Sequence, residues 1–125
     1  MSRDRQRLLD YLVHILEAIA RIERYVDDLD EVGFLTDELT QDAVIRNLEI
    51  IGEASNNIDK YYPEFSAQHD HVPFASAYEM RNALAHGYFR VDLEVVWKTL
   101  EKDLPELGLS VDKLIRQLMD ENSGL

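Results

Sequence analysis

The sequence predicts an all-α protein, an antiparallel bundle of four to five helices in a single domain spanning residues 1–125. Apolar residues recur at alternating intervals of three and four, which is the spacing of one face of an α-helix. No stretch of useful length alternates apolar and polar residues as a half-buried strand does. The chain also contains no internal repeat, low-complexity linker or domain boundary, and a helical bundle is therefore the simplest fold that accounts for it.

The first predicted helix spans residues 4–29. Its apolar positions form a single stripe on one helix face, made up of Leu8, Leu12, Ile15, Ile19, Ile22 and Val26. The acidic turn at residues 27–31 and then Gly33 are expected to end this helix.

Thr36 is the predicted N-cap of a second helix, whose inward stripe consists of Val44, Leu48, Ile51, Ser55 and Ile58. Gly52 lowers the stability of a helix relative to alanine. Its presence indicates that another backbone or a ligand comes close at that point. Pro63 is expected to close this helix.

A third helix is predicted to start near Pro73, because proline suits the first helical turn, and to end at Gly87. Its inward residues are Ala77, Met80 and Leu84. Asp92 is the predicted N-cap of a fourth helix.

Val91 and Val96 are spaced to form a hydrophobic staple at the start of this fourth helix. Pro105 is expected to interrupt it. A last helical segment covers residues 111–119, and the tail at residues 121–125 is expected to fray.

The amino-acid composition excludes several classes of protein and of functional site. The chain has no cysteine, which excludes disulfides and thiolate metal sites. It has no apolar run of the ~20 residues needed to cross a bilayer, and no signal peptide is evident at the N-terminus, so a cytoplasmic protein is expected. With 25 acidic against 13 basic residues the net charge is −12. A broad grip on nucleic acid is therefore not expected, although Arg81 and Arg90 could form a local positive pocket.

The segment from Met80 to Tyr88 (MRNALAHGY) carries the strongest functional signal. Arg81 supplies a permanent cation whose planar fork matches a phosphate. His86 can transfer protons near neutral pH. Together they suit the cleavage or binding of a phosphodiester without a metal.

Helical geometry limits how these residues can meet. Asn82 lies four residues before His86, on the same helix face, and could orient its ring. Arg81 lies about 140° around an ideal helix from His86. Either the helix loosens near Gly87, which would also bring Tyr88 beside His86, or a second copy of the chain completes the site.

A simpler interpretation of the same residues stays open. An arginine and a histidine on a helix often serve as surface ion-pair partners, and a protonated histidine stabilises a helix C-terminus. Tyr88 and Phe89 would then be core aromatic residues, because matches to a motif this short also arise by chance.

The chain resembles the HepT family of minimal HEPN-domain proteins, the toxin halves of bacterial and archaeal toxin–antitoxin pairs. That family carries an Arg-x4-His-x-Tyr signature, which here is Arg81, His86 and Tyr88. Two further segments resemble the family in the same order, TQDAVIRNLEIIGEA at residues 40–54 and YFRVDLEVVWKTLEKDLP at residues 88–105. The resemblance covers roughly the whole chain.

The resemblance implies a HEPN-like homodimer in which two signature motifs form a shared cleft. It implies a metal-independent endoribonuclease without a cofactor, acting on an RNA such as a tRNA or an mRNA. His86 would be the general acid or base and Arg81 would stabilise the charge on the phosphorus. Asn82 would support them by orienting His86 or by holding a phosphate oxygen.

The resemblance also implies a protein partner. The antitoxin of such a type VII pair is a minimal nucleotidyltransferase of the MntA type, which is thought to transfer AMP from ATP to the tyrosine hydroxyl, here Tyr88. The added nucleotide would occupy the phosphate site and repel RNA. The acidic surface of the chain could serve this partner by charge complementarity.

Other polar residues carry weaker signals. The triplet His69-Asp70-His71 offers ligands for a divalent metal, but without a distant further ligand it is interpreted as a solvated loop. Near Gly52, three residues could line the cleft or simply lie on the helix surface: Glu53, Asn56 and Asn57. The sequence assigns no role to Arg46, Asn47 or Glu49.

Two function classes are compatible with these features of the sequence. The first is a ribonuclease toxin neutralised by its partner. The second is a non-catalytic helical module that binds a nucleotidyltransferase or a nucleotide, with Arg81 and His86 as phosphate ligands only.

Overall fold

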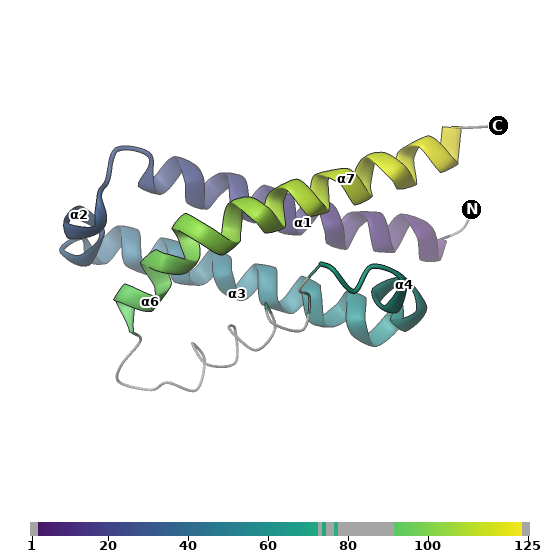
Figure 1. The fold of residues 1–125 in the computed structure, drawn as a ribbon, viewed down its shortest axis with the longest axis horizontal. Coiled ribbons are helices and arrows are strands. Elements are labelled where there is room, and N and C mark those ends of the chain that lie inside the picture. The colour runs from purple at the N-terminus through teal and green to yellow at the C-terminus, as the bar shows by residue number, and fades with distance from the viewer. Residues whose placement is uncertain (1–2, 73, 75–76, 78–91, 124–125) are drawn as a thin grey trace.

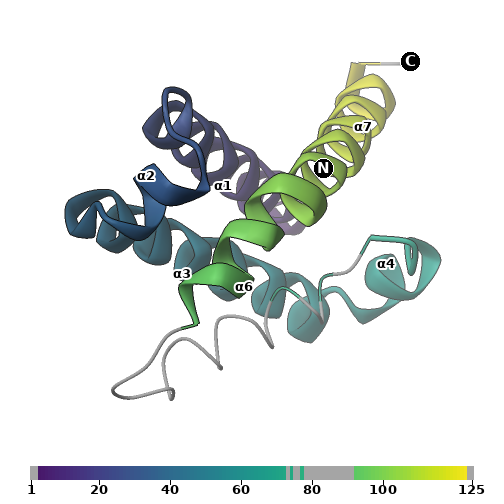
Figure 2. The same ribbon diagram turned by 60° about the vertical axis from the view of Figure 1, so that its left-hand side comes forward.

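The computed structural model describes residues 3–72, 74, 77 and 92–123, and every regular element in them is helical, as expected for an all-α protein. Three long helices dominate the structure: α1 (Arg3–Val26), α3 (Glu38–Tyr61) and α7 (Leu104–Ser123). Figures 1 and 2 show that α1 runs antiparallel to both α3 and α7. Arg5 near the start of α1 forms an ion pair with Glu121 near the end of α7.

The core lies between these three helices, and the stripes that the sequence predicts for the first two of them are part of it. The stripe residues of α1 from Leu8 to Ile22 are buried, and Val26 is half-buried. All five predicted stripe residues of α3 are buried, including Ser55. α7 adds a third stripe, formed by Leu104, Leu107, Val111, Leu114, Ile115 and Leu118. Each such side chain contributes about 1.5–3 kcal/mol when fully buried, so these stripes are the main source of stability.

The connection between α1 and α3 differs from the prediction. Helix α1 ends at Val26 rather than at Leu29, and a short helix α2 (Glu31–Leu35) follows the turn. Gly33 lies inside α2 because the Oδ1 of Asp30 accepts a 2.8 Å hydrogen bond from its backbone N–H and caps the helix. The prediction that Gly33 terminates a helix is therefore wrong.

The prediction that Thr36 is the N-cap of the next long helix, α3, is also wrong, by one residue. The hydroxyl of Thr36 donates a 2.9 Å hydrogen bond back to the carbonyl of Val32 in α2, so it is directed away from α3. Asp37 caps α3 instead, and its Oδ1 accepts a 3.1 Å hydrogen bond from the backbone N–H of Thr40. The two competing cap residues are adjacent, and local propensity does not separate them.

Pro63 closes the α3 helix as predicted, since α3 ends at Tyr61. The same proline begins a short helix that the sequence did not predict, α4 (Pro63–Gln68). Between them, the hydroxyl of Tyr62 donates a 2.7 Å hydrogen bond to the carbonyl of Asp4 on α1. Burial of the phenol and the negative charge of the nearby Asp4 raise the pKa of Tyr62 above its usual 10.0. The hydroxyl therefore stays protonated and can donate this hydrogen bond.

Pro105 does not interrupt the C-terminal helix. Helix α6 (Leu93–Lys98) continues into a π-helical turn, η1 (Thr99–Asp103), and then into α7. The N–H of Leu104 bonds to the carbonyl of Thr99, five residues earlier. Pro105 has no N–H and its ring would collide with the carbonyl four residues before it. We infer that the wider turn accommodates this ring without breaking the helix.

The remaining predictions concern the third helix and the C-terminus. Of the third helix, the described residues include only Phe74, which is buried, and Ala77, which packs against the core as predicted. Pro73, Met80, Leu84 and Gly87 lie outside the described residues. The predicted final segment at residues 111–119 is the middle of α7, and residues 121–123, expected to fray, are helical.

No helix among the described residues combines the length and the apolarity needed to cross a membrane.

Candidate functional site

The four residues predicted to carry the chemistry, Arg81, Asn82, His86 and Tyr88, lie outside the described residues. The described structure gives the two points between which this segment runs. Ala77 lies four residues before Arg81 and packs against the core. The first described residue after the segment is Asp92, at the start of α6.

The residue that follows this segment, Asp92, is the N-cap of α6. The Oδ1 of Asp92 accepts hydrogen bonds from the backbone N–H groups of Glu94, at 3.1 Å, and Val95, at 3.2 Å. This confirms Asp92 as the predicted N-cap of α6. The predicted staple joins Val96, which is buried, to Val91, which lies outside the described residues.

Helix α3 carries the first of the two further segments, residues 40–54, and presents two different faces. Its inner face is the buried stripe of the core, and Gly52 is buried as well. Its outer face carries a row of residues at helical spacing that are exposed or half-buried and, except for Ile50, polar: Arg46, Glu49, Ile50, Glu53 and Asn57.

Asn47 is a buried polar residue of α3 to which the sequence assigned no role. Its Oδ1 accepts a 2.8 Å hydrogen bond from the Nε–H of Arg21 on α1, and its Nδ2 donates to the carbonyl of Ala43. Asn47 therefore joins α1 to α3 and is a structural residue. A polar residue beside a buried helix stripe was the only signal in the sequence that could have identified it.

The outer face of α3 and the adjoining part of α1 form a depression of about 350 Å³. It is lined by Tyr11 and His14 of α1 and by the α3 residues Arg46, Glu49, Ile50, Glu53, Ala54 and Asn57. Glu53 and Asn57 lie in this depression, whereas Asn56 is not among its described lining residues. Whether any of the three lines the cleft of the signature residues stays a prediction, because those residues lie outside the described part of the chain.

The wall of this depression on α1 is fixed by aromatic packing. The ring of Tyr11 meets the ring of Tyr62 edge to face, with centroids 6.4 Å apart and planes inclined by 70°. Tyr62 is itself bonded to the backbone of α1. Tyr11 is therefore held in place at the end of the depression where α3 finishes.

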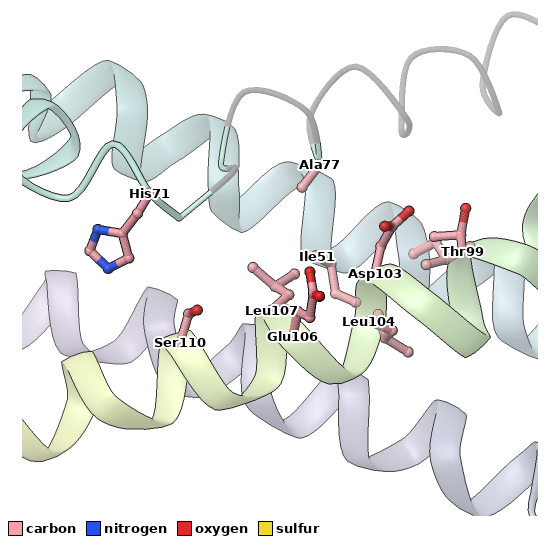
Figure 3. Close-up of a pocket in the computed structure, with 10 residues that line it drawn as sticks. Ile51, His71, Ala77, Thr99, Asp103, Leu104, Glu106, Leu107 and Ser110 are labelled. Atoms are coloured by element: carbon pink, nitrogen blue, oxygen red, sulfur yellow. The ribbon is translucent and has the colours of Figure 1, made fainter.

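A second cavity, of about 380 Å³, lies between α3, the η1 turn and the start of α7. Its floor is apolar, formed by Leu48, Ile51, Leu104 and Leu107, and its polar lining includes the carboxylates of Asp103 and Glu106 (Figure 3). Ala77 lines the same cavity. Among its described lining residues, these two carboxylates would repel a phosphate.

The His69-Asp70-His71 triplet follows α4. The ring of His69 packs on Phe65, with centroids 4.5 Å apart, and lies 5.9 Å from the ring of His71. Among the described residues, no group of three histidine or carboxylate side chains is placed to hold a metal ion. Residues 69–71 form a turn after α4, as expected for a loop.

The comparisons with known proteins agree on one family. The family model described as "Ribonuclease HepT-like" matches residues 15–114. The chain is 46% identical over 105 residues to the "Probable ribonuclease HepT" of Thermococcus cleftensis, an alignment that covers 84% of this chain and 93% of that protein.

A second relative is a longer protein of Methanocaldococcus jannaschii named "Gamma-glutamylcyclotransferase and putative RNase". It is 44% identical over 112 residues, which cover 90% of this chain but only 49% of the relative. The chain thus spans about half the length of that relative. No solved structure gives a significant match.

Proposed function

We propose, from the premise that this chain belongs to the HepT-like ribonuclease family and is an RNA endonuclease, that it is the toxin of a type VII toxin–antitoxin pair. The observation that carries the proposal is the Arg-x4-His-x-Tyr spacing of Arg81, His86 and Tyr88 in a chain of this family. A cytoplasmic location, where cellular RNA is available, is part of the proposal.

The proposed chemistry follows from the residue types. His86 removes the proton from a ribose 2′-hydroxyl or donates one to the leaving 5′-oxygen. The 2′-oxygen attacks the neighbouring phosphorus while the bond to the 5′-oxygen breaks, and Arg81 stabilises the additional negative charge on the phosphate oxygens. Asn82 orients His86 or holds a phosphate oxygen. DNA lacks the 2′-hydroxyl, so RNA is the substrate.

The proposal includes a homodimer. Arg81 and His86 do not converge on one straight helix, and two copies that face each other would supply the missing partner of each site. A shared cleft of this kind would also bring the positive charges of the two Arg81 side chains, one from each copy, to the same place. This offers a way for a chain of net charge −12 to bind RNA locally.

Regulation is proposed to act through Tyr88. A nucleotidyltransferase partner would transfer AMP from ATP to the Tyr88 oxygen, with release of pyrophosphate. The new phosphodiester places a negative charge beside Arg81 and His86 and excludes the RNA phosphate by occupancy and repulsion.

The test is cleavage of total cellular RNA by the purified protein with EDTA present. The proposal expects cleavage by the wild type and its loss in His86→Ala and in Arg81→Ala, because acid–base catalysis and charge stabilisation each contribute about 100-fold or more. His71→Ala is the matched control, since His71 is exposed and lies outside the signature, and it should cleave like the wild type.

Two results would contradict the proposal. Cleavage that persists in His86→Ala would remove the histidine from the chemistry. Absence of cleavage by the wild type, with intact binding of the nucleotidyltransferase or a nucleotide, would favour the non-catalytic helical module instead.

A further inference from the structure

The depression between α1 and α3 has a fixed order of charges along its α3 side. Arg46, Glu49 and Glu53 all line it, and they follow one another at intervals of three and four residues. Residues at these intervals lie on one helix face, and each interval advances about 4.5–6 Å along the axis at the helical rise. The charges along this side are therefore positive, negative and negative, each about one helical turn from the next.

The polar side chains of this depression have unused hydrogen-bonding capacity. Within the described part of the chain, the side chains of Arg46, Glu49 and Asn57 have no hydrogen bond or ion pair, although Glu49 and Asn57 are half-buried. Glu53 has an interaction within its own chain, but a carboxylate offers about four acceptor positions and can accept further donors. Polar groups that converge on a hollow in this way are typical of a binding site.

From this order of charges we infer that the depression binds a free basic α-amino acid, and that arginine fits it best. Such a ligand carries the complementary order: a carboxylate, an adjacent ammonium and, beyond a stem of methylene groups, a guanidinium. Its carboxylate pairs with Arg46, its ammonium with Glu49 and its guanidinium with Glu53. The inference does not involve the signature residues and is independent of the proposed ribonuclease.

The end of the depression beyond Glu53 suits a guanidinium group in particular. It is lined by the amide of Asn57 and by the ring of Tyr11. A guanidinium donates hydrogen bonds in a planar fork and stacks on aromatic rings, so the amide oxygen of Asn57 and the Tyr11 ring both match it. The ring is already held by its edge-to-face contact with Tyr62. Lysine has no planar fork, and arginine is therefore preferred.

The middle of the depression is apolar and matches the stem of the ligand. Ile50, which is half-buried, and Ala54, which is buried, line it between the charged residues. The methylene groups of a basic side chain pack on apolar surface while its charged end stays with polar partners. The volume of about 350 Å³ is at the small end of the range for ligand sites and suits a single amino acid.

The charge balance favours a basic amino acid over other small ligands. The described lining holds two carboxylates, Glu49 and Glu53, against one permanent cation, Arg46, which leaves an excess of one negative charge. Free arginine carries an excess of one positive charge and neutralises it. A phosphate would be repelled by both carboxylates, and a neutral amino acid would leave Glu53 without a cationic partner.

The test is isothermal titration calorimetry of the purified protein with L-arginine and three analogues, each of which lacks one charge. Arginine should bind saturably, with half-saturation at about 1 mM or below. Agmatine lacks the carboxylate, Nα-acetyl-L-arginine lacks the charged α-nitrogen, and citrulline has an uncharged side chain. Each analogue should bind about 5-fold or more weakly than arginine, because each loses one contact between opposite charges.

Substitutions in the protein should pair with the analogues. Arg46→Ala, Glu49→Gln and Glu53→Gln should each weaken the binding of arginine by a similar factor. Arg46→Ala should leave the binding of agmatine unchanged, since agmatine has no carboxylate to lose a partner. For the same reason Glu49→Gln should leave the binding of Nα-acetyl-L-arginine unchanged, and Glu53→Gln that of citrulline.

This pairing keeps the test decisive where a substitution disturbs the fold. Glu53 has an interaction within its own chain, and a misfolded Glu53→Gln variant would lose citrulline as well as arginine. Glu17→Gln and Arg24→Ala are the matched controls. Both residues are exposed on α1 and are not among the described lining residues of the depression, so both variants should bind arginine like the wild type.

Several results would overturn the inference. These are the absence of saturable binding, equal affinity for arginine and citrulline, and an equal loss of affinity in the two control variants. Binding that survives in Arg46→Ala but is lost in Arg81→Ala would place arginine at the signature residues instead of in the depression. None of these results bears on the ribonuclease, which cleavage of RNA in EDTA tests separately.

Discussion

The Nε–H of Arg21 on α1 donates a 2.8 Å hydrogen bond to the Oδ1 of Asn47 on α3. Asn47 is only 5% exposed, and its amide nitrogen donates in turn to the Ala43 carbonyl. This bond joins α3 to α1 beside the apolar core. Because successive helical residues are about 100° apart, an inward Asn47 leaves its neighbour Arg46 on the outer face.

Replacement of Asn47 by alanine should destabilise the bundle. The change removes a hydrogen bond to a charged group and leaves the partly buried Arg21 without this acceptor, at a cost of about 1.5–3 kcal/mol. The free energy of unfolding is measured by urea denaturation. Gln6→Ala is the control, because its hydrogen bond to Asp10 is exposed and its loss should change stability by about 0.5 kcal/mol or less. Equal effects of the two changes would contradict the role of Asn47.

Ser55→Ala should stabilise the protein. The Ser55 hydroxyl is fully buried within the core stripe of α3 and has no hydrogen-bond partner in the part of the chain that the structure describes. A buried hydroxyl without a partner costs about 1–3 kcal/mol, and alanine removes it while leaving almost the same volume filled. Thermal denaturation should show a higher midpoint.

The control for Ser55 is Ser66→Ala. The Ser66 hydroxyl donates a 2.9 Å hydrogen bond to Asp59 at an exposed site, so its loss should leave stability unchanged or slightly lower. A marked loss of stability in Ser55→Ala would mean that the hydroxyl is hydrogen-bonded.

Asp37 should make the stability of α3 depend on pH in the acid range. Hydrogen bonds from the backbone and side chain of Thr40 favour the ionised carboxylate and lower the pKa of Asp37 below its usual 3.8. The unfolded chain therefore binds this proton more readily than the folded one. The stabilisation is complete above pH 3.8 and is lost as the pH falls through the lower pKa of the folded state.

Asp37→Asn separates the cap from its charge. Asparagine also caps helices well but does not titrate, so the variant should keep most of the stability at pH 7. Its unfolding free energy should fall less steeply below pH 4 than that of the wild type. Parallel curves for the two proteins would show that Asp37 does not contribute to the acid transition.

Tyr88→Phe should produce a ribonuclease that its partner cannot inactivate. The phenyl ring lacks the oxygen that is proposed to accept AMP, so mass spectrometry after co-expression with an MntA-type nucleotidyltransferase should show no AMP increments. The wild type should show them, as should Tyr61→Phe, which removes a tyrosine that is 58% exposed. Increments that persist in Tyr88→Phe would assign the modification to another residue.

Several elements could be predicted from the sequence because their causes are local. The stripes of α1 and α3, the closing of α3 before Pro63 and the cap at Asp92 follow from helical periodicity and side-chain chemistry over a few residues. The short helix α2 was not predicted, because a glycine such as Gly33 usually indicates the end of a helix. The prediction for Pro105 was wrong because the sequence did not indicate the π-helical turn before it, which we infer accommodates the ring.

The sequence by itself determined the fold class, the core stripes, the family and the signature residues, since each depends on residue type and spacing along one chain. Only the tertiary structure decided that Asn47 is structural and that Tyr11, His14, Arg46 and Glu53 share one depression. These side chains belong to two helices, and their meeting depends on how α1 and α3 are rotated and shifted against each other, which is set by packing and not by the periodicity of either helix.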